Sequence, residues 1–243
     1  ARVLIVEKPG VTPFAEPSSE PGGPPAFRRE HTLERWSEAI MAAVQAARAL
    51  PGIAPAPTLL IGHSEGGLVA CRIAAELDDV THVACLAGGG PTQLFDIVEL
   101  ARRSAVFGRV SDDPETRATH VLRQWTRISA DPDNANAIFF GHAYRRWSSF
   151  CASSPMEELL RTEARVFIAQ GEADSAVTRE SFEALRAHLL AHGRDVTARL
   201  VEGANHSFAP GAGDADGWRA IMDEVFDWWQ TPAPRTKVLQ NGN

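Results

Sequence analysis

Runs dominated by apolar residues alternate along this chain with longer segments that have helical periodicity. The runs have the length and the flanking turn residues of buried strands, and they cover residues 3–6, 59–61, 81–87, 165–169 and 196–201. In the other segments apolar residues recur every three or four positions, which predicts helices over residues 32–50, 68–77, 179–192 and 217–230. Strands that alternate with helices in this way predict an α/β fold, with a mostly parallel sheet covered by helices on both faces.

The alternation stops after the three glycines at residues 88–90 and resumes at residue 165. No strand is predicted over residues 91–163, where the helical segments are more polar. We predict an insertion there, a core formed by residues 1–90 and 164–232, and a C-terminal tail at residues 233–243. Residues 12–30 are rich in Pro, Gly and Ser, which predicts an exposed loop beside a substrate entrance.

The strand at residues 59–61 leads into Gly-His-Ser-Glu-Gly-Gly at residues 62–67 and then into a helix. A serine between glycines on a sharp strand-to-helix turn is typical of a nucleophile elbow, which lifts a weakly nucleophilic hydroxyl toward a base and toward oxyanion donors. Gly62 and Gly66 stand where a side chain would collide with the neighbouring strand or helix. We predict that Ser64 is a nucleophile.

A base and an acid for this serine follow later strands. Asp174 ends Gly-Glu-Ala-Asp after the strand at residues 165–169, and His206 follows the strand at residues 196–201. The carboxyl ends of parallel strands lie at one edge of the sheet, where ligands bind, so both side chains are expected near Ser64. Glu172 is the alternative acid.

With these three motifs in the order Ser, Asp, His, the chain resembles the α/β-hydrolase superfamily over nearly its whole length. The resemblance implies a catalytic triad of Ser64, Asp174 and His206, with the backbone N–H of Glu65 as one oxyanion donor. It also implies that residues 91–163 are a helical cap that selects the substrate. Family members have two or three strands before the one predicted at residues 3–6, so we expect N-terminal strands to be missing from this sequence.

We also predict the roles of the two residues on either side of the serine. His63 is predicted to be a packing or hydrogen-bonding residue rather than the base, because adjacent residues on a sharp turn point apart. Glu65 places an unusual carboxylate next to the nucleophile. It either binds a substrate amine or makes a hydrogen bond within the scaffold.

Residues 141–150 are dense in aromatic and cationic side chains. They predict a pocket wall, with Tyr144, Arg146 and Trp147 as substrate-binding residues and an arginine holding a carboxylate. The alternative is the core of a small helix with a solvated arginine face. The three glycines at residues 88–90 predict a hinge into the cap rather than a phosphate cradle, because no Lys-Ser/Thr follows them.

The composition narrows the class of function. A net charge of -7 without basic-aromatic clusters argues against nucleic-acid binding, and no apolar run approaches the ~20 residues of a membrane span. Cys71, Cys85 and Cys151 lack metal spacing and are predicted to be free thiols, which fits a reducing compartment and a cytoplasmic location. We expect no metal and no cofactor.

The sequence therefore predicts a serine hydrolase that cleaves an ester, thioester or amide of a small-molecule substrate through an acyl-serine intermediate, with a carboxylesterase favoured. A serine at the elbow disfavours the dehalogenase and epoxide-hydrolase branches of the superfamily. One alternative is a serine peptidase of the prolyl-oligopeptidase type. Another is a non-catalytic ligand-binding or receptor protein on the same fold.

Overall fold

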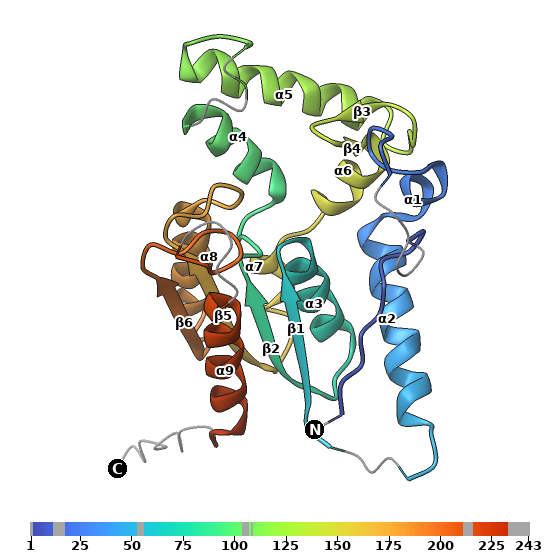
Figure 1. Ribbon diagram of the computed structural model, residues 1–243, viewed down its shortest axis with the longest axis vertical. Coiled ribbons are helices and arrows are strands. Elements are labelled where there is room, and N and C mark those ends of the chain that lie inside the picture. The colour runs from blue at the N-terminus through green and yellow to red at the C-terminus, as the bar shows by residue number, and fades with distance from the viewer. Residues whose placement is uncertain are drawn as a thin grey trace, which may run out of the picture.

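A computed structural model describes residues 2–11, 18–52, 56–103, 107, 109–210 and 216–232. Four parallel strands form its main sheet, in the order β1-β2-β5-β6 (Figure 1). They are β1 (Thr58–His63), β2 (Val80–Leu86), β5 (Arg165–Gly171) and β6 (Val196–Val201). The predicted α/β fold with a parallel sheet is confirmed.

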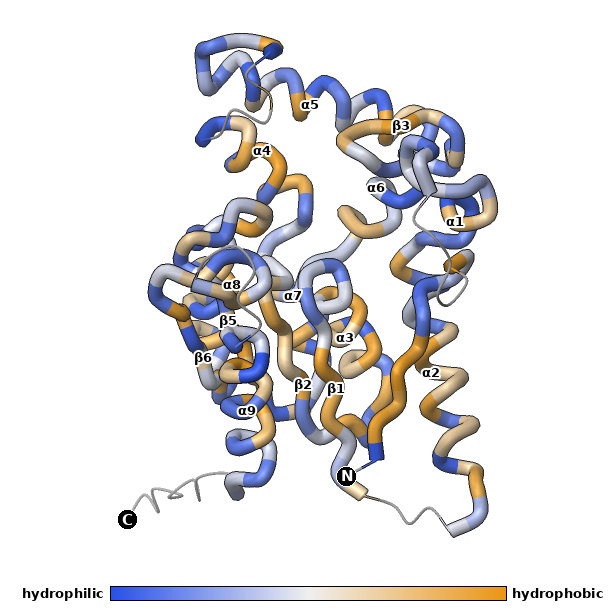
Figure 2. Tube along the Cα trace, viewed as in Figure 1, coloured by the Kyte–Doolittle hydropathy of each residue, from blue (hydrophilic) through white to orange (hydrophobic). Residues whose placement is uncertain are grey.

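The strand predicted at residues 3–6 is wrong. These residues are extended but lie outside the sheet, and Val3 and Ile5 are 79% and 84% exposed. Among the described residues β1 pairs with β2 alone, so this apolar run, drawn in orange in Figure 2, pairs with no strand of the sheet. Without a pairing partner, its backbone donors and acceptors are left to solvent.

Helices cover both faces of the sheet because successive strand residues point to opposite sides. One face carries Val83, Cys85 and Ile168, which pack with residues of α3 (Glu65–Glu76) and α8 (Arg179–Ala191). The other face carries Leu86 and Phe167, which pack against α9 (Asp216–Gln230). The helix α2 (Leu33–Arg48) lies outside α3 (Figure 1).

The loop predicted over residues 12–30 is wrong at its end, where residues form the helix α1 (Pro25–Glu30). Proline at the first position of this helix has its backbone angle already set for a helix and loses no hydrogen bond there. A Pro-rich segment can therefore start a helix as well as break one.

Residues between β2 and β5 form α4 (Gln93–Arg103), α5 (Pro114–Ala130), β3 (Ile138–Phe139), β4 (His142–Ala143), α6 (Tyr144–Phe150) and α7 (Pro155–Glu158). The two short strands pair with each other as a hairpin, so the prediction of no strand over residues 91–163 is wrong there. Each strand has two residues, too few to give a strand pattern in the sequence. In Figure 1, α4, α5 and α6 stand beyond the carboxyl ends of the main strands. Their apolar side chains form a separate cluster that includes Ile97, Val121 and Trp147. The domain boundaries and the substrate-selecting cap stay predictions, and the tail at residues 233–243 lies outside the described residues.

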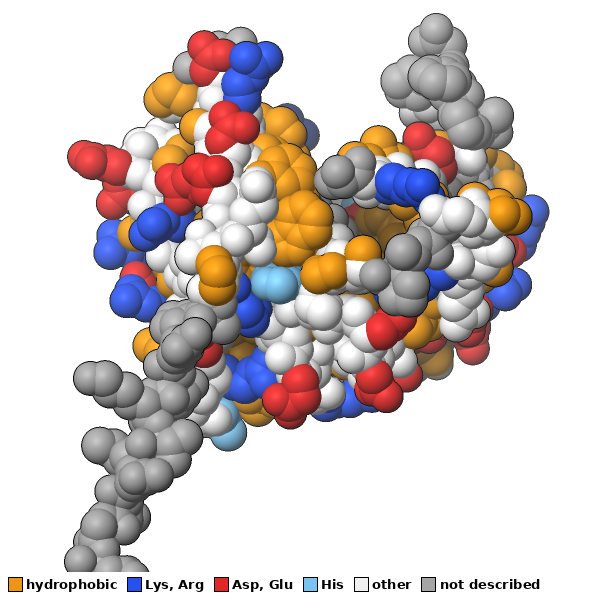
Figure 3. Space-filling view, turned by 90° about the horizontal axis from the view of Figure 1, so that it is seen from below, with side chains coloured by type: hydrophobic (Ala, Val, Ile, Leu, Met, Phe, Trp, Pro, Cys, Tyr) orange, Lys and Arg blue, Asp and Glu red, His pale blue; other side chains and the backbone are white. Residues whose placement is uncertain are grey.

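No helix in the described part of the chain has both the length and the apolar composition needed to cross a membrane. Figure 3 shows the molecule from below, where acidic, basic and hydrophobic side chains are mixed on the surface.

The cluster between α4, α5 and α6 predicts a stability effect. Trp147 is 5% exposed, and its indole Nε1 donates a hydrogen bond to the Phe139 carbonyl at 2.7 Å. Trp147→Ala is expected to lower the free energy of unfolding by about 3–5 kcal/mol, because it leaves a cavity and an unpaired carbonyl. Denaturant unfolding checks this, with Phe226→Ala as the control, since Phe226 is 36% exposed. Equal losses for the two variants would contradict a buried structural role.

Candidate active site

Ser64 occupies a strained turn between β1 and α3. Its backbone has φ 56° and ψ −124°, a conformation that few side-chain-bearing residues adopt. Two hydrogen bonds hold the turn, from Ser64 N–H to the Leu86 carbonyl at 2.8 Å and from Gly67 N–H to the Ser64 carbonyl at 2.9 Å. A Cβ at Gly62 would lie 1.8 Å from the Gly66 oxygen, so only glycine fits there. This is the geometry of the predicted elbow. The collision predicted at Gly66 is wrong, because a Cβ there would meet no atom within 4 Å.

Asp174 and His206 meet at the carboxyl edge of the sheet. His206 Nδ1 donates a hydrogen bond to Asp174 Oδ2 at 2.8 Å, and the Asp174 side chain is 1% exposed. The other carboxylate oxygen accepts the N–H groups of Ala176 at 2.7 Å and Val177 at 3.0 Å. Burial alone would raise the pKa of Asp174, but these hydrogen bonds and the nearby His206 bring it below its usual value. The carboxylate is therefore ionised and fixed in orientation.

Glu172, the alternative acid, is placed elsewhere. Its side chain is 41% exposed and lies 3.4 Å from Arg179, and one oxygen accepts the N–H of Gly203 at 3.3 Å. Of the two carboxylates, the structure brings Asp174 to His206.

His63 connects the histidine loop to the elbow. Its Nε2 donates to the His206 carbonyl at 2.8 Å, and the two rings lie 4.8 Å apart between centroids. Burial is the main cause that lowers the pKa of His63, which favours the neutral ring. The residue before Ser64 thus holds the loop of His206, so the three predicted triad residues lie on loops joined by hydrogen bonds.

The Glu65 carboxylate is surrounded by donors from three distant segments. Its Oε1 accepts from Arg146 Nε at 3.0 Å and also from Arg146 Nη2, while its Oε2 lies 2.9 Å from Lys8 Nζ and 3.3 Å from His31 Nε2. His142 Nε2 is 3.9 Å from Oε1. We call these five residues the Glu65 cluster.

Electrostatics keep this buried carboxylate charged. Burial would raise the pKa of Glu65, but Arg146, His31 and Lys8 hold it well below its usual range. Burial lowers the pKa of His31, and burial with the Arg146 charge lowers that of His142 to about 4, so both rings are neutral at pH 7. Since both Glu65 oxygens are occupied by protein donors, the structure agrees with a scaffold hydrogen bond and not with a site for a substrate amine.

Three members of this cluster have the chemistry of metal ligands. Ligand atoms of His31, Glu65 and His142 lie within 4.8 Å of one another. A cation among them would face Lys8 and Arg146, which already occupy the carboxylate oxygens. The donor set therefore fits an internal ion-pair network and does not fit a metal.

Arg146 and Trp147 are buried and pack against other side chains of the protein. Arg146 is 3% exposed, and its guanidinium lies over the rings of Trp147 at 4.0 Å and Phe150 at 4.5 Å. The alternative of a solvated arginine face is therefore wrong for Arg146. Tyr144 is partly buried against the same apolar cluster as Trp147. Substrate binding by Tyr144, Arg146 and Trp147 stays a prediction.

The three glycines after β2 allow close packing where α4 begins. A Cβ at Gly88 would lie 2.4 Å from Cys85 Sγ, and one at Gly90 would lie 2.4 Å from the Ser181 carbonyl oxygen. Asp96, on the first turn of α4, is a buried carboxyl that sequence reasoning missed. Burial raises its pKa to about 7, against the lowering effect of a hydrogen bond with Ser181. Asp96 stands alone in an amphipathic helix, and nothing in the sequence indicates that its carboxyl is buried.

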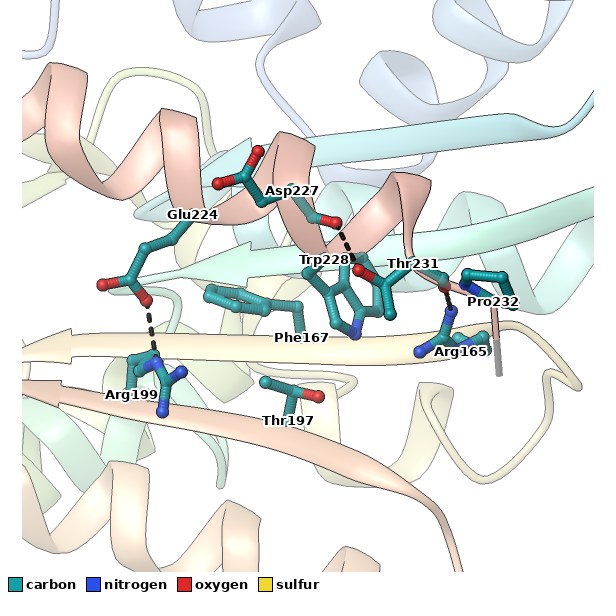
Figure 4. Close-up of a pocket in the computed structure, with 9 residues that line it drawn as sticks. All are labelled: Arg165, Phe167, Thr197, Arg199, Glu224, Asp227, Trp228, Thr231 and Pro232. Atoms are coloured by element: carbon teal, nitrogen blue, oxygen red, sulfur yellow. Dashed lines mark hydrogen bonds and ion pairs between the residues drawn. The ribbon is translucent and has the colours of Figure 1, made fainter. Parts of the chain in front are cut away.

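A separate groove of about 470 Å³ lies between α9 and the strands β5 and β6 (Figure 4). Arg165, the first residue of β5, lies over the Trp228 ring at 5.3 Å, and Arg199 pairs with Glu224 at 2.7 Å. The groove includes the amino-terminal end of β5, whereas Asp174 and His206 follow carboxyl ends. It is not part of the site around Ser64.

A serine elbow, an acid and a histidine on the carboxyl edge of a parallel sheet define a class of α/β enzymes that hydrolyse their substrates. This chain belongs to the alpha/beta hydrolase family, which matches residues 2–219. Membership identifies it as a hydrolase in general terms. The sequence gives no significant match to a curated protein.

Solved structures of low sequence identity share the fold. Est1E from Butyrivibrio proteoclasticus has a TM-score of 0.54 and 21% identity, over 82% of this chain and 70% of that one. A monoacylglycerol lipase from Paleococcus ferrophilus has a TM-score of 0.51 and 18% identity, over 82% and 75%. A puromycin-hydrolyzing peptidase from Mycobacterium tuberculosis has a TM-score of 0.51 and 20% identity, over 85% of this chain and 27% of that one.

Proposed function

We propose that this protein is a serine hydrolase of the carboxylesterase type, which cleaves an acyl bond of a small molecule through an acyl-serine intermediate. The observation that carries the proposal is the 2.8 Å hydrogen bond from His206 Nδ1 to the buried Asp174, on a loop tied to the elbow. An imidazole that donates through Nδ1 to a carboxylate has its Nε2 left as the base.

The proposed reaction has two halves. His206 Nε2 takes the hydroxyl proton as Ser64 Oγ attacks the acyl carbon, and the backbone N–H of Glu65 supports the negative charge on the carbonyl oxygen. His206 then gives its proton to the leaving group, which departs and leaves the acyl group on Ser64. In the second half water attacks the acyl carbon as His206 Nε2 takes its proton. The bond between the acyl carbon and Ser64 Oγ then breaks, His206 returns the proton to Ser64 Oγ, and the acid product leaves.

The alternatives differ in the bond that is cleaved or in whether any bond is cleaved. The monoacylglycerol lipase among the similar structures agrees with an ester substrate. The peptidase agrees with an amide. The substrate series below distinguishes an ester from a thioester or an amide.

Labelling with a fluorophosphonate tests the proposal, because this probe reacts with a serine that has a working base and oxyanion site. We expect one phosphonylated residue, Ser64, located by mass spectrometry, and no labelling of an unfolded sample. A parallel series of p-nitrophenyl esters, acyl-thioesters and aminoacyl amides is expected to show fastest turnover of the esters. A folded protein that is neither labelled nor active on the series would be a ligand-binding protein instead.

A further inference from the structure

Glu65 belongs both to the candidate active site and to the Glu65 cluster. It is the first residue of α3 and follows Ser64 directly, so the proposed oxyanion donor and the buried carboxylate belong to the same residue. The N–H groups in the first turn of a helix have no partner within the helix and are free to stabilise a negative charge. Anything that fixes Glu65 therefore also fixes the proposed donor.

The donors to the Glu65 carboxylate come from three parts of the chain. Lys8 belongs to the described N-terminal segment 2–11, and its Nζ also lies 4.9 Å from the centroid of the Trp36 ring on α2. His31 lies between α1 and α2, and Arg146 lies on α6. Their contacts hold the carboxylate from several directions, and the Glu65 side chain is only 16% exposed. A side chain held in this way has little freedom to change rotamer.

Arg146 extends the contact to the helices beyond the sheet. Its side chain is 3% exposed and lies against the Trp147 and Phe150 rings, so its position is set by α6. A buried guanidinium needs its carboxylate partner, since an unpaired buried charge is strongly unfavourable. Glu65 and Arg146 thereby connect the first turn of α3 to α6.

We propose that the Glu65 carboxylate is a positioning group, which fixes the backbone N–H of its own residue in the oxyanion site through its ion pairs with Arg146 and Lys8. This inference rests on the proposed function and assigns the carboxylate no contact with substrate. Oxyanion donors are effective because they are fixed before the reaction, and a small displacement reduces their effect.

The test compares two buried carboxylates, Glu65 at the first residue of α3 and Glu158 on α7. Glu65→Gln removes the charge that faces Arg146. Glu158→Gln is the matched control. The Glu158 side chain is 1% exposed and pairs at 2.7 Å with Arg72, which lies on α3 about two turns after Glu65 and so away from Ser64. Both variants are expected to lose stability. Rates are compared per folded molecule. Glu65→Gln should lower both the fluorophosphonate labelling rate and kcat by about tenfold or more, with KM within about twofold of the wild type. Glu158→Gln should keep the wild-type labelling rate and kcat.

A double variant separates positioning from simple stabilisation. Glu65→Gln with Arg146→Met removes both buried charges, so Tm should recover toward the wild type while kcat stays low. Recovery of kcat together with Tm would overturn the inference. Equal labelling of Glu65→Gln and the wild type would overturn it as well, with the proposed function left intact. A wild type that is not labelled would instead reject the proposed function, and this inference with it.

Lys8→Met gives a second measurement that does not depend on folding of the Glu65 variant. The Lys8 side chain is 39% exposed, so its replacement is expected to leave the fold unchanged. A severalfold decrease in kcat at constant KM supports positioning through the cluster. Unchanged kcat excludes a role of Lys8 and overturns the inference as stated.

Discussion

Replacement of Ser64 by alanine is expected to abolish ester hydrolysis and fluorophosphonate labelling, with activity below about 1% of the wild type, because loss of a nucleophile costs orders of magnitude in rate. Stability should change little, since the change removes a hydroxyl and keeps the backbone hydrogen bonds from Ser64 N–H and to its carbonyl. Steady-state kinetics, intact-mass analysis and thermal unfolding measure the three quantities.

The control for this variant is Ser207→Ala. Ser207 is the exposed serine next to His206 in sequence, and we expect the variant to retain wild-type turnover. If Ser64→Ala kept substantial activity, another nucleophile would be at work.

Replacement of Asp174 by asparagine is expected to lower kcat by about 10³–10⁴-fold, because the amide no longer holds His206 in the tautomer that leaves Nε2 as base. The side chain is 1% exposed and accepts hydrogen bonds from His206, from Gln170 and from two backbone N–H groups of its own loop, so the carboxylate is fixed beside the histidine. The kcat of the best ester substrate measures the effect.

Glu172→Gln is the matched control for the acid. Glu172 lies two residues before Asp174, is 41% exposed and faces Arg179, so its activity should stay within about twofold of the wild type. A large loss in Glu172→Gln with only a severalfold loss in Asp174→Asn would assign the acid to Glu172.

The fold and the loops of the candidate site could be predicted from the sequence because their signals are local. The elbow needs a strand, two glycines and a helix within ten residues, and Asp174 and His206 each follow a recognisable strand. Since parallel strands end at one edge, the order of strands and motifs was enough to bring these loops together. The hydrogen bond between Asp174 and His206 agrees with that prediction.

The Glu65 cluster could not be predicted in the same way. Lys8, His31 and Arg146 are far from Glu65 in sequence. Lys8 and His31 stand in polar contexts, and the aromatic segment around Arg146 indicates a pocket wall without indicating which carboxylate the arginine would meet. Which charged residues meet depends on how α6 and the N-terminal segment pack on α3. At residues 3–6 the composition indicates a strand, but a strand forms only where the backbone pairs with a neighbour, and these residues pair with no strand of the sheet.

The parallel sheet has a consequence for how the protein reaches its active form. Ser64, Asp174 and His206 follow three different strands, and β2 separates β1 from β5 in the sheet. Pairing of parallel strands requires contacts between residues far apart in sequence, which form slowly during folding because long loops must close first. Enzymatic activity should therefore return in the slowest phase of refolding, after most of the helical signal has recovered.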